Sequence, residues 1–318
     1  MSTHRSFPEY VTLDYDLGRG QSAADYPTLD AKLGRGIDVV RQALSQYERP
    51  AIMWTGGKDS SLVLYLVQQV AREDGHPVPP VVFIDHHQHF KAVLDFVEHW
   101  AEAWDLDLVY ARNADPVFER YQPGEDIPVA ELSERNRREL ARTEYEGDTF
   151  RFTADSLGGN HLLKTVALND AITEYEFDGI FSGVRWDEQA ARASETFFSP
   201  RHDAEKYPPH DRVHPILQFD ERALWDAMWG FVVPDAVEGW PEGHVPESVD
   251  DLAGFAVTDL PVSPKYFEGF RSLGTEAGSA KSADAPAWLQ DLDGTTERSG
   301  RAQDKEGLME RLRDLGYM

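Results

Sequence analysis

Short apolar runs alternate with longer segments of helical spacing over the first two thirds of the chain. The apolar runs predict strands over residues 50–55, 106–110 and 178–182, and a turn followed by a strand over residues 77–84. Between them, apolar residues recur every three or four positions, which predicts helices over residues 37–47, 60–72, 92–104 and 162–175. Residues 131–142, in a charge-dense stretch, are expected to form a solvated helix. This alternation is typical of an α/β fold, so we expect a parallel sheet with helices on both faces.

The pattern divides the chain into three parts. Residues 1–37 are polar and carry the turn-like sequence LGRG at 17–20 and again at 33–36, so they are expected to form an N-terminal arm. Residues 38–237 contain the alternating segments and are expected to form the main domain, followed by a looser C-terminal extension over 238–318. Within the extension we predict an irregular stretch and a last helix, over residues 274–300 and 305–315.

Residues 51–61 combine a strand, a glycine turn and the start of a helix. The apolar run ends at Thr55-Gly56-Gly57, where two glycines let the backbone turn tightly and lie close to a ligand. Lys58-Asp59-Ser60-Ser61 then opens the helix, whose free amide groups and positive dipole end favour phosphate. Lys58 adds a charge, and the two serine hydroxyls add donors. The sequence therefore predicts a phosphate site, with a purely structural turn as the alternative.

A second set of polar residues follows the fourth predicted strand. Gly183, Arg185 and Asp187 come directly after it, and ligands of open α/β sheets bind beyond the carboxyl ends of the strands. Arg185 suits a phosphate or sulfate oxyanion because its planar fork offers two parallel donors. The alternative is a surface helix with Asp/Glu–Arg pairs, which would contribute little to stability.

Asp85 ends the second predicted strand, next to the glycine turn in a doubly wound sheet. Its carboxylate could accept a hydrogen bond from a ribose hydroxyl or hold Mg²⁺ through water. His86, His87 and His89 follow, but their spacing does not match a structural zinc site and the chain has no cysteine to complete one. We therefore predict no resident metal site.

The charge of the chain argues against one class of partner. With 57 acidic and 31 basic side chains, the net charge is −26, and nucleic acid would be repelled by such a field. The acidity is spread along the chain, which indicates adaptation to a salty cytoplasm where self-repulsion is screened. The alternative is an ordinary acidic enzyme.

The residue content excludes further classes. Because the chain has no cysteine, it can form no disulfide, no cysteine-bound iron–sulfur cluster and no thiol nucleophile. No apolar run approaches the roughly 20 residues of a membrane helix. The N-terminal residues lack the apolar stretch of a signal peptide, so we expect a cytoplasmic protein without membrane contact.

Several segments carry a family resemblance. TGGKDS at 55–60 resembles the SGGKDS signature of the PP-loop ATP pyrophosphatases, which hold the pyrophosphate end of ATP and break the α–β bond. Other segments resemble the small catalytic subunits of two-subunit ATP sulfurylases, in the PAPS reductase branch of that superfamily. These segments are Asp85 with Phe90, KTVAL at 164–168, GVRWDEQAARASE at 183–195, RVHPI at 212–216, YFEGFRSLG at 266–274 and TTERSGRAQD at 295–304.

The chain departs from the family pattern at four positions. His86 and His87 replace Thr-Gly, Trp186 replaces the second residue of an Arg-Arg pair, and Thr275 stands where a cysteine often follows Leu-Gly.

The resemblance implies an adenine nucleotide alpha hydrolase-like, Rossmann-like fold and adenylyl transfer from ATP to sulfate. It implies catalytic roles for Lys58, Arg185 and Arg212. It implies nucleotide contacts from Thr55, Gly56, Gly57, Lys58, Asp59, Ser60, Ser61, Asp85, Gly183 and Asp187. ATP would bind with Mg²⁺ and without an iron–sulfur cluster, and a GTPase large subunit would drive the reaction.

Two other functions stay open at this point. One is a reductase of phosphosulfate nucleotides, which needs a thiol that this chain lacks. The other is a nucleotide-binding partner without catalysis, which the change at His86 and His87 keeps open.

Overall fold

The computed structural model describes residues 6–295 together with Glu297, Arg311 and Leu315. Its central element is a six-stranded sheet with the order β3-β2-β1-β6-β8-β7. The first five of these strands run parallel, and β7 is antiparallel to β8. Their bounds are β1 Pro50–Met53, β2 Val81–Ile84, β3 Leu108–Ala111, β6 Gly179–Phe181, β7 Phe198–Arg201 and β8 His210–Val213. The predicted parallel sheet is confirmed, and it gains two strands, β7 and β8, that we did not predict.

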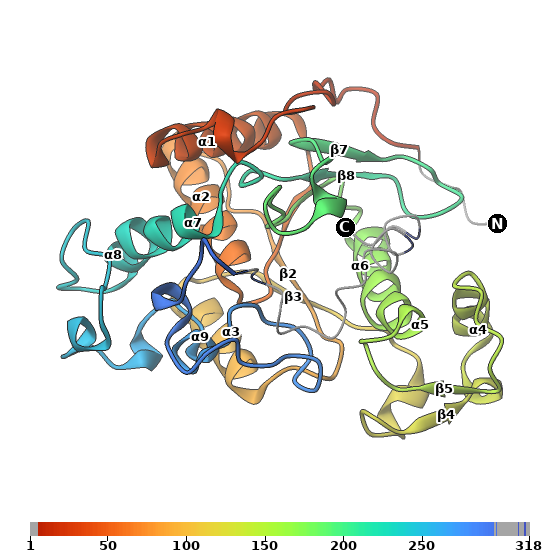
Figure 1. The fold of residues 1–318 in the computed structure, drawn as a ribbon. Helices are drawn as coiled ribbons and strands as arrows, with labels where there is room; N and C mark the ends of the chain where they lie inside the picture. The colour runs from red at the N-terminus through yellow and green to blue at the C-terminus, as the bar shows by residue number, and fades with distance from the viewer. Residues whose placement is uncertain (1–5, 296, 298–310, 312–314, 316–318) are drawn as a thin grey trace.

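Helices cover both faces of this sheet, as predicted (Figure 1). Neighbouring residues of a strand point to opposite faces, so Ile52 and Phe83 pack on one side and Ala51 and Val82 on the other. The first side packs against α1 (Leu29–Gln46), α2 (Lys58–Asp74) and α3 (Lys91–Ala103), and the second against α6 (Ala167–Tyr175).

The first helix is longer than predicted. α1 begins at Leu29 rather than at residue 37, and the side chain of Thr28 accepts a hydrogen bond from the Ala31 amide at its N-terminus. The interpretation of residues 33–36 as a turn is therefore wrong. A Cβ at Gly36 would lie 2.8 Å from the Pro215 carbonyl oxygen, so this glycine allows the helix to pack closely against the chain beyond β8.

A small second sheet lies beside the main one. β4 (Asp126–Pro128) and β5 (Thr149–Arg151) pair antiparallel, with α4 (Glu134–Ala141) between them in sequence. This segment has its own apolar core. It leads into α5 (Leu157–Asn160) and a π-helical turn (His161–Val166) that continues as α6. The predicted helix over 131–142 is thus shorter, and its first residue, Glu131, is the last residue of a 3₁₀ turn, Val129–Glu131.

Beyond β8 the chain returns to the α2 side of the sheet. α7 (Glu221–Ala227) is followed by a π-helical turn (Met228–Val232) and α8 (Val233–Ala236). In the extension, α9 (Pro264–Phe267) packs against α3 (Figure 1). The remaining short helices are the 3₁₀ turns Ala23–Asp25, Pro116–Glu119, Ala190–Arg192, Val249–Leu252, Val257–Asp259 and Ala287–Leu289.

The described part of the predicted irregular stretch consists of turns and the 3₁₀ segment Ala287–Leu289. The last predicted helix, over 305–315, lies almost entirely outside the described residues. Among the residues that are described, none of the helices combines the length and apolar character needed to cross a membrane.

Candidate active site

A cavity of about 210 Å³ lies beyond the carboxyl ends of the parallel strands. Its wall combines segments far apart in sequence: the glycine turn, the loop after β2, the helical segment before α6, the loop after β6, and the extension. The lining residues used below are Thr55, Gly57, Asp59, Ser60, His86, His89, Asp155, Lys164, Gly183, Glu188, Arg212, Tyr266, Thr275 and Glu297. This is the place that open α/β sheets use for ligands.

The conformation of the glycine turn depends on Gly56 and on hydrogen bonds of Ser60. Gly56 has φ +72°, and a Cβ there would lie 2.9 Å from Cγ2 of Val97. Both the backbone conformation and the close contact with Val97 therefore favour glycine at this position. Ser60 Oγ accepts the Thr55 amide at 3.1 Å and donates to the Gly57 carbonyl at 3.0 Å. The turn is thereby tied to the first residues of α2. Ser61 Oγ instead accepts a hydrogen bond from Nε1 of Trp54 at 3.0 Å, so the Ser61 side chain points into the protein interior.

Lys58 and Arg185 converge on one carboxylate, that of Glu297. Lys58 Nζ donates to Glu297 Oε1, and Arg185 Nη2 donates to Glu297 Oε2. The other partners of Arg185 are Asp59 and, at 2.9 Å, Asp187 Oδ1. The side chains of both cations are almost fully buried. Glu297 lines the cavity and the two cations do not.

These pairs keep the buried groups ionised. Burial acts to lower the pKa of Lys58, but the charges of Asp59 and Glu297 outweigh it and raise that pKa above its ordinary value. Burial likewise acts to raise the pKa of Glu297, yet Arg185 and Lys58 hold it below its ordinary value. Burial also raises the pKa of Asp187, against the effect of Arg185. The site therefore contains paired, charged side chains in a region shielded from water.

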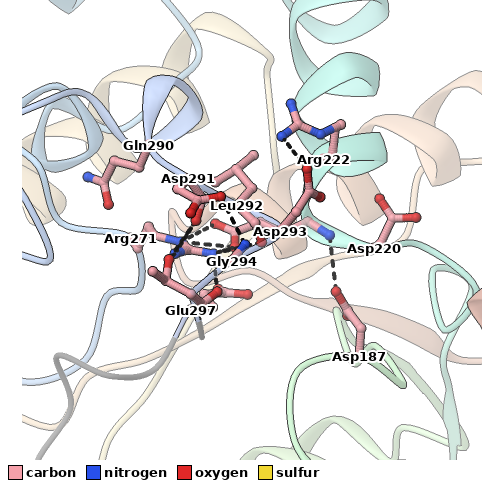
Figure 2. A network of polar contacts seen from close by, with 12 residues as sticks. Asp187, Asp220, Arg222, Arg271, Gln290, Asp291, Leu292, Asp293, Gly294 and Glu297 are labelled. Carbon is pink, nitrogen blue, oxygen red and sulfur yellow. Dashed lines mark hydrogen bonds and ion pairs between the residues drawn. The ribbon is translucent and has the colours of Figure 1, made fainter.

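Arg271 joins the extension to the site. Its guanidinium pairs with Glu221, with Nη2 at 2.6 Å from Oε2, and donates to the carbonyl oxygens of Asp291 and Leu292, both at 3.4 Å, and of Thr295 at 3.2 Å. Figure 2 shows Arg271 beside Asp291, Leu292 and Glu297. The carbonyl of Arg271 also accepts Lys58 Nζ at 3.0 Å. One residue therefore holds both the extension and the lysine of the glycine turn.

The other predicted site residues of the loop after β6, Gly183 and Asp187, have structural contacts, and Arg212 on β8 lies at the cavity wall. A Cβ at Gly183 would lie 2.9 Å from backbone atoms of Asp59 and Ser60, so this glycine lets the loop touch the start of α2. Asp187 accepts the Glu221 amide at 3.1 Å as well as Arg185. Arg212, on β8, is buried and contributes to the cavity wall.

Asp85 is engaged away from the cavity. Its carboxylate pairs with Arg112 and accepts the His87 amide at 2.9 Å. Burial would raise the pKa of Asp85, but these two partners lower it. His86 and His89 line the cavity instead, with ring centroids 3.7 Å apart. Burial lowers the pKa of His89 to about 4 and that of His86 well below its ordinary value, so both imidazoles are neutral at pH 7.

Six of the predicted site residues therefore meet at the cavity wall and six do not. At the wall are Thr55, Gly57, Asp59, Ser60, Gly183 and Arg212, whereas Gly56, Lys58, Ser61, Asp85, Arg185 and Asp187 lie outside it. Sequence reasoning missed Glu297, Arg271 and Tyr266, whose hydroxyl accepts the Lys58 amide at 2.9 Å. Their segments carried the family resemblance, and the charged and tyrosine side chains within them were the available signal.

The arrangement of acidic side chains bears on metal binding. Within the described part of the chain, no group of three or more His, Asp and Glu side chains is arranged to hold a metal ion. Asp59, Asp155, Glu188 and Glu297 nevertheless line the cavity. Mg²⁺ commonly binds through substrate phosphates and one or two carboxylates, so the wall fits a magnesium ion that arrives with a nucleotide.

Comparison with known proteins identifies the family. The model of the phosphoadenosine phosphosulfate reductase domain matches residues 49–234, more than half of the chain and all strands of the main sheet. The chain belongs to this family. Within the phosphoadenosine phosphosulfate reductase family, a curated relative from Hahella chejuensis, named sulfate adenylyltransferase subunit 2, is 26% identical over 88% of this chain and 94% of its own. The protein of the same name from Rhizobium etli is 27% identical over 88% and 74%.

Solved structures bear on the fold. FMN adenylyltransferase of Candida glabrata superposes with a TM-score of 0.54, at 14% identity and over 89% of this chain and 94% of that chain. Its complex with FAD and inorganic pyrophosphate gives a TM-score of 0.53 at 15% identity. This likeness supports the predicted adenine nucleotide alpha hydrolase-like fold.

Proposed function

We propose that the chain transfers the adenylyl group of ATP to sulfate, giving adenosine 5′-phosphosulfate and pyrophosphate. The observation that carries the proposal is the convergence of Lys58 and Arg185 on one anion beside the glycine turn. Curated family members of similar length are named for the same activity, sulfate adenylyltransferase subunit 2. The fully cysteine-free sequence argues against the reductase chemistry of the family's description, which needs a thiol.

The proposed roles follow from where the cations lie. Lys58 and Arg185 share the Glu297 carboxylate, so we assign both to the β,γ-phosphates, together with the amides at the start of α2. Arg212 contributes to the cavity wall from β8, and we assign it to sulfate. Gly56 and Gly57 provide the turn, and Asp85 acts indirectly through the β2 loop.

Positioning and charge stabilisation carry the reaction. A sulfate oxygen attacks the α-phosphorus, forming a new P–O bond while the bond to the β-phosphate bridging oxygen breaks. The electron pair leaves on pyrophosphate, whose developing charge Lys58 and Arg185 stabilise. Both cations remain protonated because their carboxylate partners raise their pKa values. Magnesium enters as part of the MgATP substrate, near the cavity carboxylates.

The wider setting of the enzyme is also a proposal. The relatives are named as a second subunit, which supports a partner chain, and we propose a GTPase large subunit that drives the unfavourable transfer. The net charge of −26 supports a protein that works at high salt, where repulsion between exposed carboxylates is screened.

The position of bond cleavage tests the proposal. Incubation with ATP labelled at the γ-phosphate should give labelled pyrophosphate, in the presence of sulfate and not in its absence. Because the forward reaction is unfavourable, exchange of labelled pyrophosphate into ATP is the more sensitive readout, and it too should require sulfate. Labelled orthophosphate as the primary product, or exchange that is independent of sulfate, would contradict the proposed function.

A further inference from the structure

The proposed mechanism leaves Glu297 without a role, although it occupies the centre of the site. Its carboxylate accepts hydrogen bonds from both Lys58 and Arg185. Glu297 forms part of the cavity wall, whereas the two cations are buried behind it. An anion that enters the cavity therefore meets a carboxylate before it meets either cation.

Charge balance makes Glu297 and a bound polyphosphate mutually exclusive. Arg185 also pairs with Asp59 and Asp187, and Lys58 Nζ lies 3.4 Å from Asp59 Oδ2. These two aspartates already balance the two cations without Glu297. A polyphosphate added beside Glu297 would place further negative charge in a buried site, where like charges strongly disfavour one another.

The attachment of the extension allows the exchange. Thr295 is anchored by Arg271, which donates to both its side-chain and its backbone oxygen. Arg271 is in turn held by Glu221 in α7. Glu297 comes two residues after this anchor, and its carboxylate takes no part in the Arg271–Thr295 contacts, so displacing the carboxylate does not require these contacts to break.

We propose that Glu297 is a specificity-determining residue that fills the pyrophosphate subsite until the polyphosphate of ATP displaces it. This inference rests on the proposed function, which supplies ATP and sulfate as the two ligands. The N–H groups that Lys58 and Arg185 direct at Glu297 would otherwise be open to any small anion, including sulfate, which must instead bind at its own subsite. Polyphosphate carries more charge and more acceptor oxygens than sulfate, so polyphosphate replaces the carboxylate and sulfate does not.

Equilibrium binding to Glu297→Gln tests the proposal. The amide keeps the size of the side chain and removes its charge. We expect calorimetric titration with inorganic pyrophosphate, without ATP, to show at least about tenfold tighter binding than in the wild-type chain, which corresponds to about 1.4 kcal/mol. Sulfate should compete with pyrophosphate in the variant and not in the wild type. Unchanged or weaker pyrophosphate binding would overturn the proposal, and equal competition by sulfate in both proteins would overturn its selective role.

Two further variants keep the test decisive. Glu268→Gln removes an exposed carboxylate of the same extension, which pairs with Lys265, and it should leave pyrophosphate binding unchanged. If Glu297→Gln does not fold, as judged by its thermal unfolding, Glu297→Asp keeps the charge on a shorter side chain. It should bind pyrophosphate more tightly than the wild type, and failure to do so would also overturn the proposal. Because these titrations need no turnover, they remain informative if sulfate-dependent exchange is absent.

Discussion

The two ends of the cavity treat buried charge in opposite ways. At the glycine-turn end, Lys58 and Arg185 stay charged, because neighbouring carboxylates outweigh the effect of burial and raise the pKa of each. At the end formed by the β2 loop, His86 and His89 lose their charge, since burial lowers both pKa values. Pairing and neutralisation are the two means by which a protein interior accommodates an ionisable group.

The difference suggests that the two ends of the cavity bind different parts of a ligand. At the end beside the glycine turn, the same donors of Lys58 and Arg185 can serve either of two anions, as the competition between Glu297 and polyphosphate requires. At the other end, the stacked neutral rings of His86 and His89 lie in the same wall as Lys164, and these rings suit a planar group such as a nucleotide base. The following experiments test whether the two ends respond as differently as their electrostatics imply.

The largest effect should come from removing one partner of the Arg271–Glu221 pair. Arg271→Met leaves the Glu221 carboxylate buried without its main partner, so we expect a loss of about 3–5 kcal/mol in the free energy of unfolding, measured by denaturant titration. The double variant Arg271→Met, Glu221→Gln should recover part of the loss. As a control, Arg222→Met breaks an exposed pair with Asp293 and should cost under about 1 kcal/mol. Equal losses in Arg271→Met and Arg222→Met would refute the buried-pair interpretation.

The next effect concerns catalysis at the charged end. Lys58→Ala removes a cation assigned to the leaving pyrophosphate, and Arg185→Ala removes its neighbour. Each should reduce sulfate-dependent pyrophosphate exchange by roughly a hundredfold, because one charge-assisted contact contributes about 2–3 kcal/mol in the transition state. Lys91→Ala, which breaks an exposed pair with Asp95, serves as the control. Full exchange activity in Lys58→Ala would mean that the glycine turn is only structural.

The buried histidines should make the free energy of unfolding depend on pH. An unfolded histidine takes up a proton near its ordinary pKa of 6.5, but native His89 does so only near pH 4. The unfolded state therefore binds more protons between these values, and the free energy of unfolding falls as the pH is lowered through this window. His89 alone should cost about 2 kcal/mol at pH 5.

Denaturant titrations at pH 7 and pH 5 measure this loss. His214, whose pKa burial lowers to about 3, adds to it in the same direction. The difference between the two pH values should shrink in His89→Gln, which has no proton to take up. A pH dependence that is identical in the variant and the wild type would show that His89 is not the group responsible.

The smallest effect tests a hydrogen bond between the extension and the cavity wall. Thr275 Oγ1 donates to the Asp155 carboxylate, with oxygen distances of 2.8 and 2.7 Å, and accepts the Gly278 amide at 2.9 Å. Thr275→Val keeps the shape and removes these bonds, so it should lower the free energy of unfolding by about 1–2 kcal/mol. Thr275→Ser keeps the hydroxyl and should lose less. If the serine variant is the less stable of the two, the methyl packing of Thr275 matters more than its hydroxyl.

The sequence predicted the features that depend on neighbouring residues. Four strands, the glycine turn and the helices beside them follow from local apolar spacing, and all were found within a few residues of their predicted bounds, apart from the early start of α1. β8 was missed because its residues His210, Asp211 and Arg212 are polar, yet every residue of the strand is buried. Distant partners make this burial tolerable: Asp211 accepts hydrogen bonds from Tyr15 at 2.9 Å and Tyr47 at 2.8 Å.

The arrangement of the charged end could not be predicted in the same way. Lys58 and Arg185 were singled out, but their carboxylate partner Glu297 and the anchor Arg271 lie in a loosely patterned extension. No periodicity relates a residue to a partner more than 200 positions away. Long-range pairing of this kind depends on the completed fold rather than on local spacing.

The Arg271 carbonyl and the Glu297 carboxylate lie 213 and 239 positions after the lysine that they hold. A ribosome that adds 5–20 residues per second needs on the order of 10–50 s to cover that distance. Throughout that interval the nascent chain can build β1 and α2, but Lys58 has neither acceptor. The contacts that position Lys58 therefore form only after Arg271 and Glu297 have been translated, and a chain that stops before Arg271 lacks both of these acceptors.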